Sequence, residues 1–181
     1  MKRIYTIGHS TRTLDELVAL LRDHGVTRLA DVRRYPGSRR YPHFSGESLA
    51  QSLPPLGILY EHFADLGGRR SPVPDSPNGA WNNDQFRGYA DHMASDLFRR
   101  AVDELLDPSD ASGAAPATAV MCAEAVPWRC HRNLLSDELV RRGVEVIHII
   151  GAGSFQPHSL SRMARLEPDR VVYPPPQAEM F

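Results

Sequence analysis

Cysteine, lysine and long apolar runs are all scarce in this 181-residue sequence. It holds two cysteines, and Lys2 is the only lysine among its 21 basic residues. Two cysteines cannot build a disulfide framework, and no stretch approaches the roughly 20 apolar residues of a membrane-spanning helix. Arg3 and His9 interrupt the N-terminal segment before it could form the apolar region of a signal peptide. We therefore expect a cytoplasmic protein without a membrane partner.

Positive and negative side chains are nearly equal in number, with a formal net charge of −1. This excludes the global positive field of a protein that coats DNA. A chain of this length buries roughly 70% of the surface of its unfolded form, so its core needs no disulfide to hold it. We expect one α/β domain at residues 1–173 and a C-terminal tail at residues 174–181.

Apolar segments typical of buried strands alternate with segments of helical periodicity. Strands are predicted at residues 3–7, 26–32, 57–60, 118–122 and 144–150. Helices are predicted between the capping residue Thr13 and Gly25, and at residues 45–53, 84–106 and 132–142. Crossovers of this length favour parallel pairing. The sequence therefore predicts an open, mostly parallel sheet in three layers, of the Rossmann, flavodoxin or rhodanese kind, with helices on both faces.

Polar residues follow almost every predicted strand. They are His9 and Ser10, Asp31 and Arg33, Glu61 and His62, Cys122 and Glu124, and His148. Ligands of open parallel sheets bind beyond the carboxyl ends of the strands, where loops and helix N-termini converge. Plainer interpretations remain open, since Asp31 and Arg33 could form a local ion pair and His148 could be a core histidine. We expect a site at this edge of the sheet.

The segment from Met121 to Asn133, MCAEAVPWRCHRN, concentrates reactive residue types. A thiol near a helix N-terminus, with arginines and an imidazole close by, is where a reactive thiolate is expected. Alternatively, Cys122 is a buried and inert core residue. Metal binding is a rival chemistry, with a divalent ion as the candidate cofactor, although two cysteines eight residues apart do not have zinc-ribbon spacing. The candidate metal ligands are His9, Cys122, Cys130 and His131.

Arginines gather in the loops that are expected to line this edge. They are Arg33, Arg34, Arg39, Arg40, Arg69, Arg70, Arg129 and Arg132. Guanidinium groups beside a helix N-terminus are suited to holding phosphate or carboxylate. The sequence therefore predicts an anionic small molecule or a nucleotide as the ligand.

Five motifs together resemble the domain-of-unknown-function 488 family (DUF488): IGHS, DVRRYPGS, GILYEHFADLGGRR, FRGYADHM and MCAEAVPWRCHR. The resemblance spans Ile7 to His148 and implies an α/β fold with a shared polar site, but no reaction. The site residues it implies are His9, Ser10, Asp31, Arg33, Cys122, Glu124, Cys130, His131 and Arg132. A weaker likeness is to the layout of rhodanese-like sulfurtransferases and the related phosphatases. Because Glu124 lies where those proteins have an anion-cradling loop, we do not expect simple persulfide or phosphocysteine chemistry.

Three functional hypotheses follow. The first is an enzyme, a hydrolase or transferase, acting on a phosphate-containing or nucleotide-like substrate. Its predicted catalytic residues are Asp31, Cys122, Glu124 and His131, and its predicted anion-binding residues are His9, Ser10, Arg33, Arg69, Arg129 and Arg132. The second is a nucleic-acid-associated protein that uses the arginine loops and exposed Tyr35, Tyr41, Phe44 and Trp81. The third is a metal-binding or thiol-redox protein.

Overall fold

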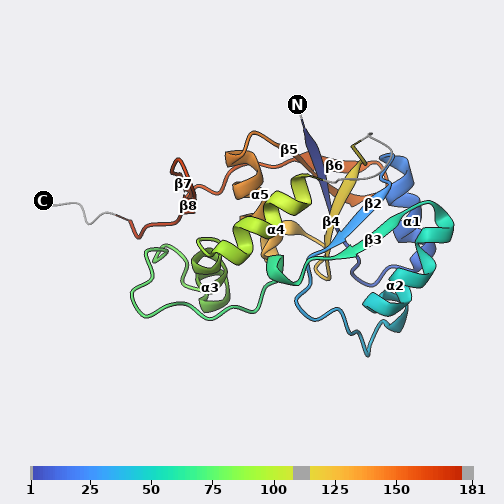
Figure 1. The fold of residues 1–181 in the computed structure, drawn as a ribbon, viewed down its shortest axis with the longest axis horizontal. Coiled ribbons are helices and arrows are strands. Elements are labelled where there is room, and N and C mark those ends of the chain that lie inside the picture. Colours follow the sequence, from blue (N-terminus) through green and yellow to red (C-terminus); the bar gives the residue numbers. More distant parts are fainter. Residues whose placement is uncertain (1, 108–114, 177–181) are drawn as a thin grey trace, which may run out of the picture.

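The protein has an α/β fold built on one mixed, mostly parallel sheet (Figure 1). The computed structural model describes residues 2–107 and 115–176. The strands are β1 (Arg3–Gly8), β2 (Arg28–Asp31), β3 (Leu59–His62), β4 (Thr118–Cys122), β5 (Glu145–Gly151) and β6 (Ser154–Pro157). They lie in the order β3-β2-β4-β1-β5-β6. The first five are mutually parallel and β6 runs antiparallel to β5, which confirms the predicted fold class.

Helices cover both faces of the sheet, as predicted. One face carries α1 (Leu14–Asp23) and α2 (Gly46–Ser52), whose apolar side chains pack on residues such as Leu29 and Met121 of the sheet. The opposite face carries α3 (Asp84–His92), α4 (Asp96–Leu106) and α5 (Arg132–Arg141), packed around residues such as Val120. Figure 1 shows these two groups of helices on either side of the strands. Short 3₁₀ turns complete the structure: η1 (Pro42–Phe44), η2 (Pro54–Leu56), η3 (Ala64–Leu66) and η4 (Pro127–Arg129).

The first helix begins where its capping residue predicts. The Thr13 hydroxyl accepts a hydrogen bond from the backbone N–H of Glu16 at 3.1 Å, which satisfies one of the free donors of the first turn. From there α1 buries Leu17, Val18, Leu20 and Leu21 against the sheet.

The prediction of one long helix at residues 84–106 is wrong. Two helices, α3 and α4, replace it, because the Ser95 side chain accepts a hydrogen bond from the backbone N–H of Phe98 and begins a new helix. Leu97, an apolar residue of this segment, lies in the first turn of α4 and is 56% exposed.

Smaller corrections concern strand limits and the C-terminal segment. The third strand begins at Leu59 instead of 57, because Gly57 has a left-handed φ of 80° and ends η2. Neither β6 nor the two-residue strands β7 (Arg165–Leu166) and β8 (Val171–Val172) are predicted from the sequence, since β6 and β7 are exposed and β7 and β8 are too short to carry a pattern. Of the predicted tail, Pro174 to Pro176 have no regular structure, and 177–181 lie outside the described residues.

The strand order places a topological switch point between β1 and β4. The chain leaves β1 toward α1 on one face and leaves the neighbouring β4 toward α5 on the other. A crevice therefore opens between the carboxyl ends of these two strands, where open α/β sheets bind ligands. The order matches neither the Rossmann nor the flavodoxin arrangement. Within the described ranges, no helix is long and apolar enough to cross a membrane.

Candidate active site

A cavity of about 700 Å³ opens at the switch point, beyond the carboxyl ends of β1, β2 and β4. Four loops and the beginning of α3 form its walls. Nine of the residues predicted from the sequence line it: His9, Ser10, Arg33, Arg69, Cys122, Glu124, Arg129, Cys130 and His131. The remaining two predicted site residues, Asp31 and Arg132, lie behind its walls and are almost fully buried. The carboxyl-edge rule therefore located the cavity from the sequence.

The loops after β1 and β4 are held together by the backbone. The N–H of His9 donates to the carbonyl of Cys122 at 3.0 Å, and the N–H of Ser10 donates to that of Ala123 at 2.9 Å. A Cβ atom at Gly8 would lie 1.7 Å from the carbonyl oxygen of Glu124. Only glycine at this position lets the loop after β4 lie directly on the end of β1.

Two residues of the cavity wall adopt a backbone conformation that side chains disfavour. Ser10 has a φ of 48° and Arg69 a φ of 58°. They are the only non-glycine residues with positive φ in the part of the chain that the structure describes. Unfavourable backbone of this kind tends to cluster at functional sites, where the surrounding structure holds it in place. No feature of the sequence indicates either conformation.

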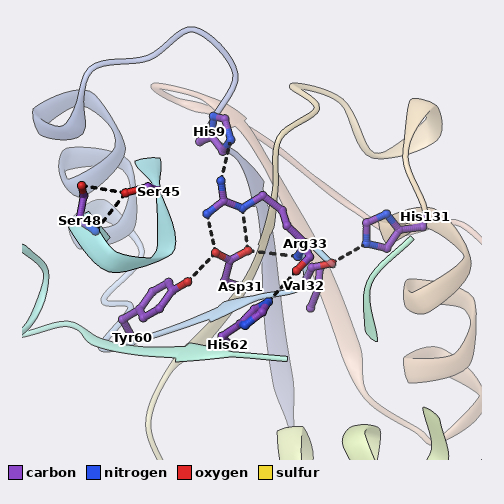
Figure 2. A network of polar contacts seen from close by, with 9 residues as sticks. All are labelled: His9, Asp31, Val32, Arg33, Ser45, Ser48, Tyr60, His62 and His131. Carbon is purple, nitrogen blue, oxygen red and sulfur yellow. Dashed lines mark hydrogen bonds and ion pairs between the residues drawn. The ribbon is translucent and has the colours of Figure 1, made fainter. Parts of the chain in front are cut away.

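A buried polar network supports one wall of the cavity (Figure 2). Arg33 donates through Nε and Nη2 to the two carboxylate oxygens of Asp31, at 2.8 and 2.5 Å. The Tyr60 hydroxyl also donates to Asp31, at 2.7 Å, and His62 donates to the Arg33 carbonyl. Burial and the Asp31 carboxylate raise the pKa of Tyr60 above its usual range, so it stays a donor. Asp31 thus acts on the site through Arg33, which it orients toward the cavity.

His9 is held as a neutral ring. Its Nδ1 lies 3.0 Å from the Ser10 carbonyl, which can only accept, so Nδ1 carries the proton. Its Nε2 then accepts from Nη1 of Arg33 at 3.3 Å, and the ring stacks on Phe44. Burial, with the nearby Arg33 charge, lowers the pKa of His9 to about 4. His9 therefore offers no positive charge to an anion at neutral pH.

The two cysteines meet at the base of the cavity. Cys122 ends β4 and Cys130 precedes α5, and their sulfur atoms are 2.7 Å apart. The backbone N–H of Arg132 also points at the Cys130 sulfur, at 3.4 Å. Two thiols this close share a proton, and the sulfur with more donors around it carries the negative charge. Cys130 is that sulfur.

A buried arginine behind the thiols favours this ionisation. Arg132 is 1% exposed, and no carboxylate of the described residues forms an ion pair with it. Its Nη2 donates to the Glu124 carbonyl at 2.6 Å, whereas its Nε has no hydrogen-bond partner in the described ranges. A buried charge needs a counter-charge, and the nearest candidates are the cysteine sulfurs, whose charge interaction with Arg132 raises the Arg132 pKa.

The pKa values of the two thiols move apart as a result. Burial opposes ionisation of Cys130, but the hydrogen bond from Cys122 and the nearby His131 and Arg132 hold the Cys130 pKa well below its ordinary value. Burial and the neighbouring Cys130 raise the pKa of Cys122 well above that value. The surroundings therefore favour ionisation of Cys130 over that of Cys122.

His131 is oriented as a partner for the thiolate. Its Nε2 donates to the Val32 carbonyl at 2.9 Å (Figure 2). This leaves Nδ1 as the nitrogen that faces Cys130, 3.6 Å from its sulfur. Gly68 packs on the other side of the ring, where an added Cβ would lie 2.9 Å from Nδ1. The second glycine of the motif LGGRR thus keeps this ring in position.

Positive charge dominates the open part of the cavity. Besides Arg33, the lining contains Arg34, Arg40, Arg69 and Arg129, against one acidic residue, Glu124. The Arg34 side chain donates to the Arg69 carbonyl at 2.7 Å and fixes the strained loop. Two other arginines of the predicted set do not line the cavity: Arg39 is exposed, and Arg70 donates to the carbonyls of Ala64 and Gly67.

Several predicted features are absent or differently placed. In the described parts of the chain, no three His, Cys, Asp or Glu residues are grouped so that they could hold a metal ion, and the four candidate ligands form no such group. The expectation that Phe44 and Trp81 are exposed is wrong. Phe44 is fully buried, and Trp81 packs against Phe86 and Tyr173.

His148 lies in the core instead of the cavity. Its Nδ1 accepts from the Thr6 hydroxyl at 2.7 Å, and its Nε2 donates to His158 at 2.9 Å. His158 in turn donates to Asp137 at 2.8 Å. Sequence reasoning missed His158 and Asp137, because neither follows a predicted strand or belongs to a recognised motif.

Fold and cavity together define an α/β protein with a cysteine-containing polar site at the carboxyl edge of its sheet. Among protein families, the model described as "Domain of unknown function DUF488" matches residues 13–139. The chain belongs to this DUF488 family, as its motifs indicate. No curated protein matches the chain, and no solved structure does.

Proposed function

We propose that the protein is an enzyme, a hydrolase or transferase, that uses the Cys130 thiolate as a nucleophile on a phosphate-containing or nucleotide-like substrate. The observation that carries the proposal is the Arg132 guanidinium, buried without a carboxylate partner among the described residues and placed beside the two thiols. It favours a thiolate at neutral pH, and the thiolate is the nucleophilic form of cysteine. Of the two cysteines, Cys130 is the better nucleophile because its pKa is the lowered one.

The reaction follows from the arrangement of Cys130 and His131. The thiolate attacks the electrophilic centre of the substrate, so that a bond to sulfur forms and the bond to the leaving oxygen breaks. The imidazolium of His131, with Nδ1 directed at the site, gives its proton to that oxygen. Glu124, at the exposed mouth of the cavity, accepts a proton from the water or acceptor hydroxyl that then attacks the covalent intermediate. The bond to sulfur breaks in this step, and the Cys130 thiolate leaves. Transfer to water makes the enzyme a hydrolase, and transfer to another hydroxyl makes it a transferase.

Charge and local structure support the anionic substrate. Four arginines line the open part of the cavity, and the N-terminus of α5 begins directly after His131. Guanidinium groups and helix N-termini both favour phosphate groups. Glu124 would repel a fully charged free phosphate close to Cys130, which favours substrates whose charge lies away from the attacked atom. A free thiolate requires a reducing compartment, so the cytoplasm suits this chemistry.

Alkylation of the cysteines tests the proposal directly. Iodoacetamide should modify Cys130 before Cys122, with a pH midpoint well below the ~8.5 of an ordinary thiol, as read by peptide mass spectrometry. Arg132→Met should move that midpoint upward. Inorganic phosphate should slow the reaction, and Arg69→Gln together with Arg129→Gln should remove this protection. An ordinary midpoint for Cys130 in the wild type would overturn the proposal.

Turnover provides the second test. In a screen of phosphodiesters and nucleotides, activity should be lost by at least about a hundredfold in Cys130→Ser. Phosphomonoesters should be poor substrates, because their dianionic phosphate would lie beside Glu124. Cys122→Ser should keep a measurable part of the activity, because Cys122 does not attack the substrate. Wild-type activity in Cys130→Ser would assign the chemistry to another residue.

A further inference from the structure

We propose that Cys122 and Cys130 form a redox couple that reduces small hydroperoxides and is restored by a dithiol. The proposal rests on the pairing of the two sulfurs and not on the anionic substrate. Their separation of 2.7 Å is short enough for a bond to form with little movement, since a disulfide needs about 2.0 Å. The residues come from two rigid elements, because Cys122 ends β4 and Cys130 is followed by α5. The pair is thus preorganised by the fold.

The two thiols differ in the way that a two-cysteine peroxide cycle requires. The Arg132 backbone N–H and the His131 ring both face the Cys130 sulfur, so negative charge is favoured on Cys130, and the proton is favoured on Cys122. The first attacks the peroxide, and the second resolves the product. Both sulfurs line the base of the cavity and are at most 5% exposed, so a small molecule can reach them whereas the surface of another protein cannot.

In the first step the Cys130 thiolate attacks the terminal oxygen of the hydroperoxide. A sulfur–oxygen bond forms, the oxygen–oxygen bond breaks, and the leaving alkoxide takes a proton from the His131 imidazolium. Sulfur loses two electrons and becomes a sulfenic acid, while the peroxide is reduced to an alcohol, or to water if hydrogen peroxide is the substrate. In the second step the Cys122 sulfur attacks Cys130. The disulfide bond forms, and hydroxide leaves with the proton of the Cys122 thiol as water.

An external dithiol returns the pair to its starting state. One of its sulfurs attacks the disulfide and its second sulfur resolves the mixed disulfide, so the dithiol leaves oxidised and both cysteines are reduced. Arg132 makes this step favourable. Oxidation removes the thiolate and leaves the buried guanidinium without its counter-charge, which destabilises the disulfide form relative to the reduced form. The pair is therefore an oxidising one that a dithiol reduces readily.

Peroxide treatment of the full-length protein tests the cycle. One equivalent of hydrogen peroxide should produce a peptide that links Cys122 to Cys130, two mass units below the sum of the reduced peptides, and dithiothreitol should reverse it. With excess dithiothreitol, peroxide should be consumed over many turnovers. Cys130→Ser should lose this consumption by at least a hundredfold. In the absence of dithiothreitol, Cys122→Ser should consume one equivalent of peroxide and stop with a sulfenic acid on Cys130, detected by its adduct with dimedone.

Matched variants make the result decisive. Met163→Leu, at an exposed methionine distant from the cavity in the sequence, should consume peroxide like the wild type, which excludes methionine oxidation as the source. Arg132→Met should shift the equilibrium with glutathione at least tenfold toward the disulfide, or about 30 mV, and Arg132→Lys should shift it less because the charge is kept.

The proposal is overturned if no Cys122–Cys130 link forms or if Cys130→Ser still turns over peroxide. Cys122→Ser separates the two proposals, because its hydroxyl can still donate to Cys130, so that group transfer should be reduced but measurable, whereas no Cys122–Cys130 disulfide can form.

Discussion

At the scale of single residues, the site depends on buried charges whose partners are fixed by the fold. Asp31 is fully buried and accepts hydrogen bonds from Arg33 and Tyr60. Arg132 is buried as deeply, yet no carboxylate of the described residues forms an ion pair with it. The first charge is compensated within the network, and the second is left for a thiolate to compensate. The difference is the reason why we propose a supporting role for Asp31 and a reactive one for Cys130.

Asp31→Asn should destabilise the protein by about 3 kcal/mol, because it leaves the buried Arg33 guanidinium without its counter-charge. Urea unfolding at pH 7 measures the change. Asp65→Asn is the matched control at an exposed aspartate whose side chain forms no ion pair in the described structure, and it should stay within about 0.5 kcal/mol of the wild type. Equal effects of the two substitutions would show that the Asp31–Arg33 pair contributes nothing to stability.

Gly8→Ala should displace the loop after β4, because the added Cβ would lie 1.7 Å from the Glu124 carbonyl oxygen and neither backbone can yield easily. We expect a loss of roughly 3 kcal/mol or more in stability, beyond that of ordinary overpacking, together with slower alkylation of Cys130. Gly151→Ala is the control, since a Cβ added there would meet nothing within 4 Å in the described structure. A stable Gly8→Ala variant with unchanged Cys130 alkylation would contradict the packing described.

At the scale of elements, the sequence shows the apolar patterns of helices and strands, but it does not show where a helix with a continuous pattern breaks. The apolar residues of α1 and of β4 predict both elements closely, because each has a single buried pattern and a clear end. The apolar pattern of residues 84–106 continues past Ser95 with helical spacing. It therefore gives no sign that α3 ends and that Ser95 is the N-cap of a second helix, α4. A serine inside an apolar helical pattern, followed by Asp96, was the available signal.

Ser95→Ala should remove the N-cap of α4 and lower the free energy of unfolding by about 1 kcal/mol. Ser95→Asp keeps an oxygen that can cap the helix, so it should retain most of the stability that Ser95→Ala loses. The difference between the two variants measures the contribution of the capping hydrogen bond. Ser154→Ala, at an exposed serine of β6 with no side-chain hydrogen bond in the described structure, serves as the control. If Ser95→Ala and Ser154→Ala are equally stable in urea, the cap contributes nothing.

At the scale of the whole molecule, the sheet explains why much of the site could be predicted. Parallel strands end at one edge, so residues that follow β1, β2 and β4 converge there whatever the loops do. The placement of Arg132 was not predictable, since an arginine in the first turn of a helix is ordinarily solvated. The contact between Cys122 and Cys130 depends on the path of the segment between them, and the conformations of Ser10 and Arg69 depend on neighbours far away in the sequence.

A chain of hydrogen bonds crosses the core behind the site and joins distant parts of the sequence. Asp137 can only accept, so His158 donates to it, His148 donates to His158, and the Thr6 hydroxyl donates to His148. Arg132 completes the chain by donating to Thr6 at 3.3 Å. A ring nitrogen that accepts a hydrogen bond must carry no proton, and this applies to Nδ1 of His148 and to Nδ1 of His158. The chain therefore holds only while His148 carries a single proton.

Acid should unfold the protein through this chain. Burial, with His158 and Arg132 close by, lowers the pKa of His148 to about 3, against about 6.5 in an unfolded chain. Above pH 6.5 both states are neutral and His148 adds no pH dependence. Below it the unfolded chain takes up a proton that the folded protein does not, so the free energy of unfolding falls by about 1.4 kcal/mol per pH unit until the folded pKa is reached. The lowered pKa of His9, about 4, acts in the same direction.

Urea unfolding at pH 7.0, 5.5 and 4.5 measures the slope, and we expect a total loss of at least roughly 2 kcal/mol from His148 alone over this range. His148→Gln should be less stable at pH 7, because its amide fits the chain poorly, but its stability should fall less steeply with acid. His43→Gln replaces an exposed histidine and should keep the wild-type slope. An unchanged slope in His148→Gln would mean that acid acts elsewhere. A reduced slope would show that the neutral ring of His148 links the stability of the fold to pH.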